Sequence, residues 1–508
     1  MSSFNPKDIS NIYWASNEGF KAGRDPMGIE NSSVATYGCL LPGLTNLTSR
    51  IRYYSFFCWL LNEYDLNGKQ RFKTHQRNFV RRAELAMAFV LNGRGELAIA
   101  GAQFIWEGNL NEISRGIYDL AEGADYRTDK TNSYWTFPQG ALGQYYIGSM
   151  VYLNLLRIEE NRFYVRQRGK ELAEAFRQST DATARERFLK TVENGVIKVD
   201  DIDLFLHLSI GSISLHSPEW EFLNTILVSP DANGSTFRRD SIYLFIKALC
   251  IERVSVKDFP ECEYWHSKEK SSPSNAEFGW YFFYLCEVLH YSVETILWFI
   301  LEMAERHNLM PIPAFMHLCE ETIASYMPTN MKNVEDCVQD NDGIISDLLE
   351  TLKETVRSGN FSEAAGQAVW LLLRLYNDAV SNLTDIEKFE KENDLYRQFG
   401  IFSVFIKNYV GKHLSLPISL YVGKILRQVM NDHTMSACRK MGQNLSDLRK
   451  FLIEDGCIVH VETRFPQFTN PRTKSLYSFL RDMQYIDENN CMTPVSIQFI
   501  EDYEKERA

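Results

Sequence analysis

The sequence predicts a mainly α-helical, multi-domain protein with winged-helix modules near residues 110–176 and 440–508. The 508 residues include 28 glycines and 15 prolines, and so few helix breakers favour helices over a many-stranded sandwich. In both of these regions, short runs in which apolar and polar residues alternate lie between helical segments, a pattern typical of hairpins. The length suits two to four domains, and composition and pattern place three along the chain: residues 1–180, 181–400 and 401–508.

The first predicted domain, residues 1–180, is helical and ends in a winged-helix-like unit. A turn at Asp25-Pro26 precedes a helix that Thr45 or Asn46 can cap and that extends to Leu61. A second amphipathic helix covers residues 77–91. The end of the domain has the order helix, hairpin, helix: residues 140–156, the segment RIEENRFYVRQRG turning at Glu160-Asn161, and residues 170–176.

The middle domain, residues 181–400, is predicted to be helical with polar connections. The segments 255–276 and 329–343 have the composition of a loop and of an exposed linker. Between and after them, long apolar patterns predict three helices, over residues 277–306, 344–356 and 361–375.

The last domain, residues 401–508, contains the second predicted winged helix, from Asn444 to Tyr503. After a helix over residues 417–431, we expect a helix over 446–454 and a strand over 457–463. Thr469-Asn470-Pro471-Arg472 is a strong helix start, because it pairs a capping residue with an early proline. A small hairpin over 484–493 and a final helix from Pro494 complete the pattern.

Charge, cysteine usage and hydropathy predict a cytoplasmic protein without a membrane partner. The net charge is −12, so any contact with nucleic acid depends on local basic residues. The 10 cysteines include no Cys-x-x-Cys pair, which fits a reducing compartment. The N-terminus lacks the pattern of a signal peptide. The most apolar segment, Trp280–Met303, contains Glu287, His290, Glu294 and Glu302, which indicates a buried helix rather than a membrane span.

Two sets of basic residues are candidate contacts for double-stranded DNA. The C-terminal set is Arg464, Arg472, Lys474 and Arg481, and the set on the first hairpin is Arg162, Arg166, Arg168 and Lys170. Cations on a recognition helix and a wing can bind phosphates. Winged helices also dock proteins, and Asp482, Asp487 and Glu488 border the C-terminal set and would repel phosphate, so both interpretations stay open.

The strongest enzymatic candidate is the pair Arg427 and His433. Their spacing resembles the Arg-x(4–6)-His signature of helical HEPN ribonucleases, in which the two residues handle the proton and the phosphate of RNA cleavage. The alternative is a surface arginine and a histidine that interacts with the end of a helix. Cys262 and His266 are too few ligands for zinc. The sequence contains no Walker loop and no dinucleotide fingerprint, so we predict no metal and no cofactor.

Cations alternate with aromatic residues between Gly23 and Leu61, for example at Arg50-Ile51-Arg52-Tyr53-Tyr54. Such residues can stack on bases or hold an acidic partner. They can equally form an aromatic core from which the arginine stems extend to the surface.

Three blocks of sequence resemble a family of bacterial proteins encoded in anti-phage defence islands. The blocks are GRDPMGIENSS, LLPGLTNLTSRIRYYSFFCWLL and FTNPRTKSLYSFLRDMQYID, and the resemblance around them covers about a quarter of the chain, at its two ends. The resemblance implies a defence role as one component of a multi-gene system and assigns no catalytic residue.

The leading hypothesis is therefore a non-enzymatic scaffold or adaptor in a bacterial defence complex, which binds a partner ATPase or nuclease and contacts DNA through its basic residues. Winged helices at both ends of a helical middle are also similar to the layout of kleisin subunits that bridge SMC ATPases, an analogy at the level of the fold alone. The rival hypotheses are a HEPN-like ribonuclease effector and a winged-helix DNA-binding regulator.

Overall fold

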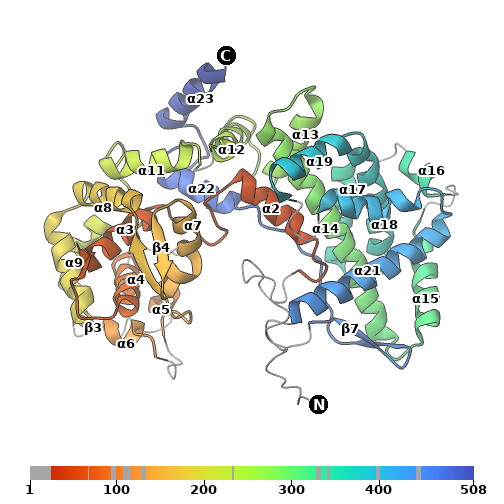
Figure 1. The fold of residues 1–508 in the computed structure, drawn as a ribbon, viewed down its shortest axis with the longest axis horizontal. Helices are drawn as coiled ribbons and strands as arrows, with labels where there is room; N and C mark the ends of the chain where they lie inside the picture. Colours follow the sequence, from red (N-terminus) through yellow and green to blue (C-terminus); the bar gives the residue numbers. More distant parts are fainter. Residues whose placement is uncertain are drawn as a thin grey trace, which may run out of the picture. The chain divides into compact units, whose positions relative to one another are not determined.

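The computed structural model confirms a mainly α-helical, multi-helix fold (Figure 1). In the described residues every sheet has two strands. The structure describes residues 25–66, 68–92, 99–106, 116–127, 133–231, 234–327, 333–339, 344–395, 401–441 and 448–507.

The chain forms two compact units, and each is built from two separated stretches of sequence. Unit 1 contains the described residues up to Tyr37 together with Glu263–Thr469, and unit 2 contains Gly38–Cys262 together with Asn470–Ala508. This division differs from the three consecutive domains predicted over 1–180, 181–400 and 401–508. The prediction placed boundaries at changes in local composition, which do not show that a chain leaves a unit and later returns to it.

Unit 2 is organised around helix α3 (Arg52–Tyr64). Of its thirteen residues, all except Asn62 are buried, so the helix packs on every side, as a central helix does. Helices α4 (Gln76–Asn92) and α8 (Gln167–Ser179) pack against it. The remaining helices of this unit are α5 (Ala102–Trp106), α6 (Leu120–Ala124), α7 (Ile147–Tyr152), α9 (Ala182–Asn194), α10 (Ile202–Phe205), α11 (Pro218–Val228), α12 (Phe237–Ile246), α22 (Thr473–Asp482) and α23 (Pro494–Arg507).

Three antiparallel strand pairs belong to unit 2: β1 (Asp65–Leu66) with β2 (Lys69–Gln70), β3 (Ile117–Asp119) with β6 (Val196–Lys198), and β4 (Leu156–Glu159) with β5 (Arg162–Val165). The last pair is the predicted hairpin, with Glu159 opposite Arg162. Both turn residues, Glu160 and Asn161, have positive φ, as a two-residue hairpin turn requires. The predicted order of helix, hairpin and helix is thus confirmed near residue 160, but the structure does not establish a winged helix there.

Unit 1 is organised around the long helix α14 (Asn275–Arg306). Ser274 caps its first turn, and Glu277 completes a capping box. By length and composition α14 could cross a membrane, but its most apolar 18-residue window is entirely buried by other parts of the protein. It packs along α18 (Phe361–Val380), and α21 (Ile418–Met441) also contacts it. The long apolar pattern in the sequence is therefore the core helix of this unit.

The other elements of unit 1 are α15 (Ile312–Ala324), α16 (Val334–Gln339), α17 (Ile345–Ser358), α19 (Leu383–Glu392), α20 (Phe402–Tyr409) and the antiparallel pair β7 (Phe451–Glu454) and β8 (Cys457–His460). The chain passes from one unit to the other within helices α2 (Glu30–Leu40) and α13 (Phe259–Glu269), and again between Thr469 and Asn470. The predicted loop over 255–276 was wrong, because α13 forms within it.

The predicted C-terminal winged helix does not form a single module. The helix expected over 446–454 is wrong in its described part, since Phe451–Glu454 is strand β7 and pairs with β8 across the Asp455-Gly456 turn. Residues 442–447 lie outside the described part of the chain. The β7–β8 pair belongs to unit 1, whereas α22 and α23 belong to unit 2. Between these two helices, the expected hairpin is reduced to one bridge, from Ile486 to Met492.

Candidate functional site

Arg427 and His433, the predicted nuclease pair, lie on helix α21 but do not meet. His433 is fully buried: its Nδ1 lies 2.9 Å from the Pro26 carbonyl oxygen, and its Nε2 accepts a hydrogen bond from the Lys450 amide. The Arg427 side chain is 56% exposed and pairs with Glu320 at 3.2 Å. Six residues along a helix place two side chains about 120° apart around its axis. The pair therefore provides no site for phosphate and proton together.

Most of the basic residues predicted on the first hairpin bind groups of unit 2 itself. Arg162 pairs with Asp65, Arg166 donates to Asn154 Oδ1 at 2.8 Å, and Arg168 donates to the Leu153 carbonyl at 3.3 Å. Burial lowers the pKa of Arg168 below its usual value. Lys170 is exposed and lines a small hollow with Arg162. Of the four, only Arg162 is paired with an acidic side chain, whereas Arg166 and Lys170 remain exposed.

The C-terminal basic residues belong to different units. Arg464 lies in unit 1, and the other three lie in unit 2. Arg472 is half-buried, with a positive φ of 64° at the start of α22, and donates to the Leu41 carbonyl at 3.0 Å. Lys474 and Arg481 are exposed. Within unit 2, only these two of the predicted residues on α22 project to solvent in the described structure.

Asp482, which was expected to repel phosphate next to these cations, has a structural role. Its side chain is 6% exposed, and it forms an ion pair with Arg50 at 2.6 Å. It also accepts a hydrogen bond from the Ile51 amide. The two residues connect the start of α3 to α22 within unit 2.

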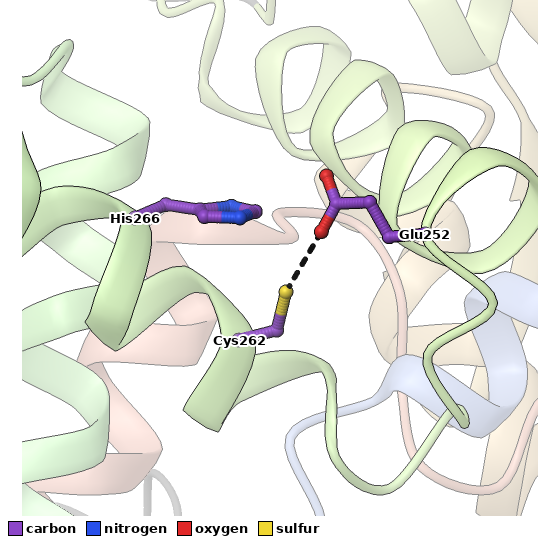
Figure 2. A group of neighbouring side chains, drawn as sticks. All are labelled: Glu252, Cys262 and His266. Atoms are coloured by element: carbon purple, nitrogen blue, oxygen red, sulfur yellow. Dashed lines mark hydrogen bonds between the residues drawn. The ribbon is translucent and has the colours of Figure 1, made fainter.

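Cys262 and Glu252 form a small polar contact at the surface of unit 2. The thiol points at the carboxylate and donates a hydrogen bond to its Oε2 at 3.3 Å (Figure 2). Cys262 lies in the first half of α13, four residues before His266. A thiol and a carboxylate alone are fewer ligands than a zinc site requires.

Unit 2 contains a groove that the sequence did not reveal. Helices α11 and α23 and the segment 484–495 form its walls, and its volume is about 820 Å³. Trp220, Tyr485 and Phe499 form an apolar floor and are at most 9% exposed. Two of them are fixed by hydrogen bonds: the Trp220 indole donates to the Met483 carbonyl at 3.1 Å, and the Tyr485 hydroxyl donates to Asn224 at 2.6 Å.

The rim of this groove carries more acid than base. Asp502 and Glu506 project from α23, and Arg239 from α12 pairs with Glu506 at 2.6 Å. The hydrogen bond from Arg239 lowers the pKa of Glu506, so this carboxylate stays ionised at neutral pH. Leu215, which is 40% exposed, adds an apolar side chain at the edge. The groove can therefore bind an apolar group that carries a positive charge.

A second concentration of ionisable side chains lies in the core of unit 1. Glu287, His290 and Glu294 share one face of α14 and are 4%, 2% and 4% exposed. Burial lowers the pKa of His290, but Glu294 and Glu287 raise it further, so that it lies well above its usual value. Burial raises the pKa of the nearby Asp25, against the opposing effect of Lys440.

Sequence reasoning missed both places for different reasons. The groove joins residues that lie more than 250 positions apart, such as Trp220 and Phe499, and no local pattern connects them. The buried cluster did leave a signal, because Glu287, His290 and Glu294 are spaced by three and four residues within an apolar helix. From the sequence alone, these residues indicated only that the segment is not a membrane span. The chain matches no family model, no curated protein and no solved structure.

Proposed function

We propose that this chain is a non-enzymatic adaptor of a bacterial anti-phage defence complex and that the groove of unit 2 docks a partner subunit. The resemblance of the three sequence blocks supports the defence role. The groove is the observation that carries the docking role, since its apolar floor and acidic rim suit a protein segment. The cysteine usage, without Cys-x-x-Cys pairs, supports a cytoplasmic location for this complex.

The chemistry of the groove defines the partner segment. Its floor of Trp220, Tyr485 and Phe499 favours one or two large apolar side chains, because aromatic pockets provide most of the binding energy in protein interfaces. Asp502 at the rim favours a lysine or arginine beside it, because the neighbouring Glu506 is already paired with Arg239. The partner is thus an ATPase or nuclease subunit that presents an apolar segment with a basic residue.

The arrangement of basic residues in unit 2 favours protein docking over DNA reading. Binding to a duplex depends on several cations that reach phosphates together. Arg162, Arg166, Arg168 and Arg472 are held by carboxylate, amide or carbonyl groups of the chain. Arg427 and His433 lie on different faces of α21, so no observation favours the ribonuclease alternative.

Two groove variants and two matched controls test this proposal. Leu215→Asp places a charge at the apolar edge, and Asp502→Lys reverses the acidic rim. The controls are Ile497→Asp, at a residue of α23 that is 44% exposed and does not line the groove, and Glu501→Lys, next to Asp502. Each variant is co-expressed with tagged products of the genes that flank its own, and both copurification and phage resistance are measured.

We expect both groove variants to weaken capture by about tenfold or more, as the loss of an interface anchor does, and to reduce phage resistance. The controls should behave as the wild type does, and all four variants should keep its melting temperature. Capture that both groove variants leave unchanged contradicts docking at this site. RNA cleavage by the purified chain alone contradicts the non-enzymatic role.

A further inference from the structure

Among the described residues, several polar atoms in the core of unit 1 have no partner in hydrogen-bonding geometry. They are both ring nitrogens of His290, Asp25 Oδ2 and Glu287 Oε1. Burying such groups without a partner destabilises the folded state. The His290 ring lies between two carboxylates, with Nε2 3.3 Å from Glu294 Oε1 and Nδ1 3.7 Å from Glu287 Oε1. Proteins usually satisfy such groups with a hydrogen bond, a water molecule or an ion.

Three of these side chains can hold one ion. Asp25, His290 and Glu294 each offer one ligand atom, and these atoms all lie within 4.8 Å of one another. Ligands of a zinc or manganese ion stand about 3–4 Å apart, so small rotations of the side chains complete the site. We propose that Asp25, His290 and Glu294 bind a divalent first-row transition-metal ion in the core of unit 1.

The ligand types define the class of metal. An imidazole nitrogen with carboxylate oxygens suits Zn²⁺, Mn²⁺ or Fe²⁺. Ca²⁺ and Mg²⁺ prefer sites made of oxygen alone. Glu287, on the other side of the His290 ring, is in a position to orient the imidazole, as the carboxylates behind metal-bound histidines do.

Each carboxylate near the ring is fixed by backbone amides through one oxygen. Asp25 Oδ1 accepts hydrogen bonds from the amides of Met27 and Gly28. On α14, Glu294 Oε2 accepts from the Gln467 amide at 3.0 Å, and Glu287 Oε2 accepts from the Thr469 amide at 2.7 Å. The second oxygens of Glu287 and Glu294 face the imidazole, and Oδ2 of Asp25 has no hydrogen-bond partner among the described residues. Such pre-orientation is typical of metal ligands and their supporting residues.

The charge balance favours a cation at this place. Asp25, Glu287 and Glu294 are buried carboxylates. Lys440 donates a hydrogen bond to the Asp25 carbonyl oxygen, and its positive charge opposes the rise in the pKa of the Asp25 carboxyl group. With the His290 imidazole neutral, as it is in a metal ligand, and with Glu30 and Arg464 near Lys440 cancelling each other, three carboxylates against one ammonium group leave an excess of two negative charges. A divalent ion compensates this excess, and uncompensated charges are costly in a protein core.

The burial of the ligands indicates a structural site. Asp25, His290 and Glu294 are 7%, 2% and 4% exposed, whereas a catalytic metal keeps a position open for substrate. The fourth position of the ion is then filled by the second oxygen of a carboxylate or by a buried water molecule. The ion joins the turn that precedes α2 to the middle of α14, beside the segment 467–469. Metal binding should therefore stabilise unit 1, because an ion that binds only the folded state shifts the folding equilibrium.

The first test uses the wild-type chain. After dialysis against a chelator, it is titrated with Zn²⁺ in competition with a fluorescent chelator, and with Mg²⁺ as the control ion. We expect about one tightly bound Zn²⁺ per chain, a higher melting temperature and no response to Mg²⁺. Substitution with Co²⁺ should give ligand-field absorption bands that report nitrogen and oxygen ligands. If the wild type binds no Zn²⁺ and shows no Co²⁺ bands, His290 is a protonated partner of the two carboxylates and the proposal is wrong.

The second test assigns the ligands. His290→Gln removes the imidazole, and Asp25→Asn retains an oxygen that can accept from Met27 and Gly28. Both should weaken Zn²⁺ binding by at least about 100-fold, since even supporting residues of metal sites contribute tenfold to 100-fold.

The control is Glu390→Gln, a carboxylate of unit 1 that is 3% exposed and bonded to Ser403. Adding Cys262→Ser to every variant removes an unrelated thiol ligand. Unchanged affinity in both folded variants overturns the assignment, and the Co²⁺ spectrum of the wild type decides the question if a variant does not fold.

Discussion

Buried arginine side chains act as cross-links in unit 2. Arg238, 4% exposed, donates to the carbonyl groups of Pro42, Ile226, Leu227 and Ser229. Arg52 pairs with Glu219 at 3.0 Å and lies over the ring of Phe176. A guanidinium group suits this role because it presents five donors in a fixed plane. Arg52 is one of the cations that alternate with aromatic residues near the N-terminus. Its contacts with Glu219 and Phe176 show that this arginine is part of the core of unit 2.

Glu84 gives unit 2 a dependence on pH. It is fully buried and accepts hydrogen bonds from the Tyr134 hydroxyl and from the amides of Ala141 and Leu142. Burial raises its pKa from 4.5 to about 7, despite these hydrogen bonds. The folded chain therefore holds a proton between about pH 4.5 and 7 that the unfolded chain releases.

We predict that the free energy of unfolding of unit 2 decreases as the pH rises through this window, by about 3 kcal/mol from Glu84 alone. Glu84→Gln cannot ionise and should flatten the dependence, whereas Glu171→Gln, at an exposed position of α8, should retain it. The free energy of unfolding is measured by urea denaturation at a series of pH values, with hydrogen exchange in α3 and α4 as the signal for unit 2. Parallel pH profiles for Glu84→Gln and the wild type would show that Glu84 is ionised in both states.

At the scale of elements, close contact between the first hairpin and α8 depends on a glycine. A Cβ at Gly169 would lie 2.3 Å from the Leu155 carbonyl oxygen and 2.8 Å from a methyl group of Val165. The carbonyl belongs to the backbone, so it cannot move aside as a flexible side chain does. The hairpin and α8 can pack this closely because residue 169 has no side chain.

Gly169→Ala is therefore predicted to destabilise unit 2 by about 1–3 kcal/mol through overpacking, although alanine favours a helix by about 1 kcal/mol. Gly148→Ala is the matched control, because Gly148 lies in α7 and a Cβ there has nothing within 4 Å. It should be neutral or stabilising. Chemical denaturation of the two variants measures the difference, and equal stabilities for them would refute the packing argument.

The sequence predicted long elements well and short ones poorly. Helices α4, α14 and α17 lie close to the predicted ranges, because an apolar face repeated over several turns is a strong signal. Strand β7 was missed although Asp455-Gly456 is a frequent hairpin turn. Its four residues follow leucines at helical spacing, and this pattern favoured a helix. Helix α13 was missed because its polar and charged residues have the composition of a loop.

At the scale of the whole molecule, the return of the chain to each unit could not be predicted. Tyr54 packs edge-on against Phe479 at 5.7 Å between ring centroids, and the Tyr503 hydroxyl donates to Asp240 at 3.0 Å. These pairs are separated by more than 250 residues, and a single sequence carries no signal for such distances. The groove of unit 2 shares this property, since its walls come from both stretches of the unit.

This architecture predicts an unequal response to truncation. A chain that ends at Thr469 loses α22 and α23, and with them the ion pair of Arg50 with Asp482 and the hydrogen bond of Trp220 to Met483. Truncation also uncovers the apolar surface that α22 and α23 bury, such as Leu476, Phe479 and Leu480, and the loss of this burial removes a large part of the stability of a typical domain. We expect hydrogen exchange to accelerate in α3 and α11 of unit 2 and to remain slow in α14 and α18 of unit 1.

A consecutive arrangement, with residues 401–508 as a separate domain, predicts instead that α3 and α11 keep their protection. Hydrogen exchange of the truncated chain, compared with the full chain, distinguishes the two arrangements.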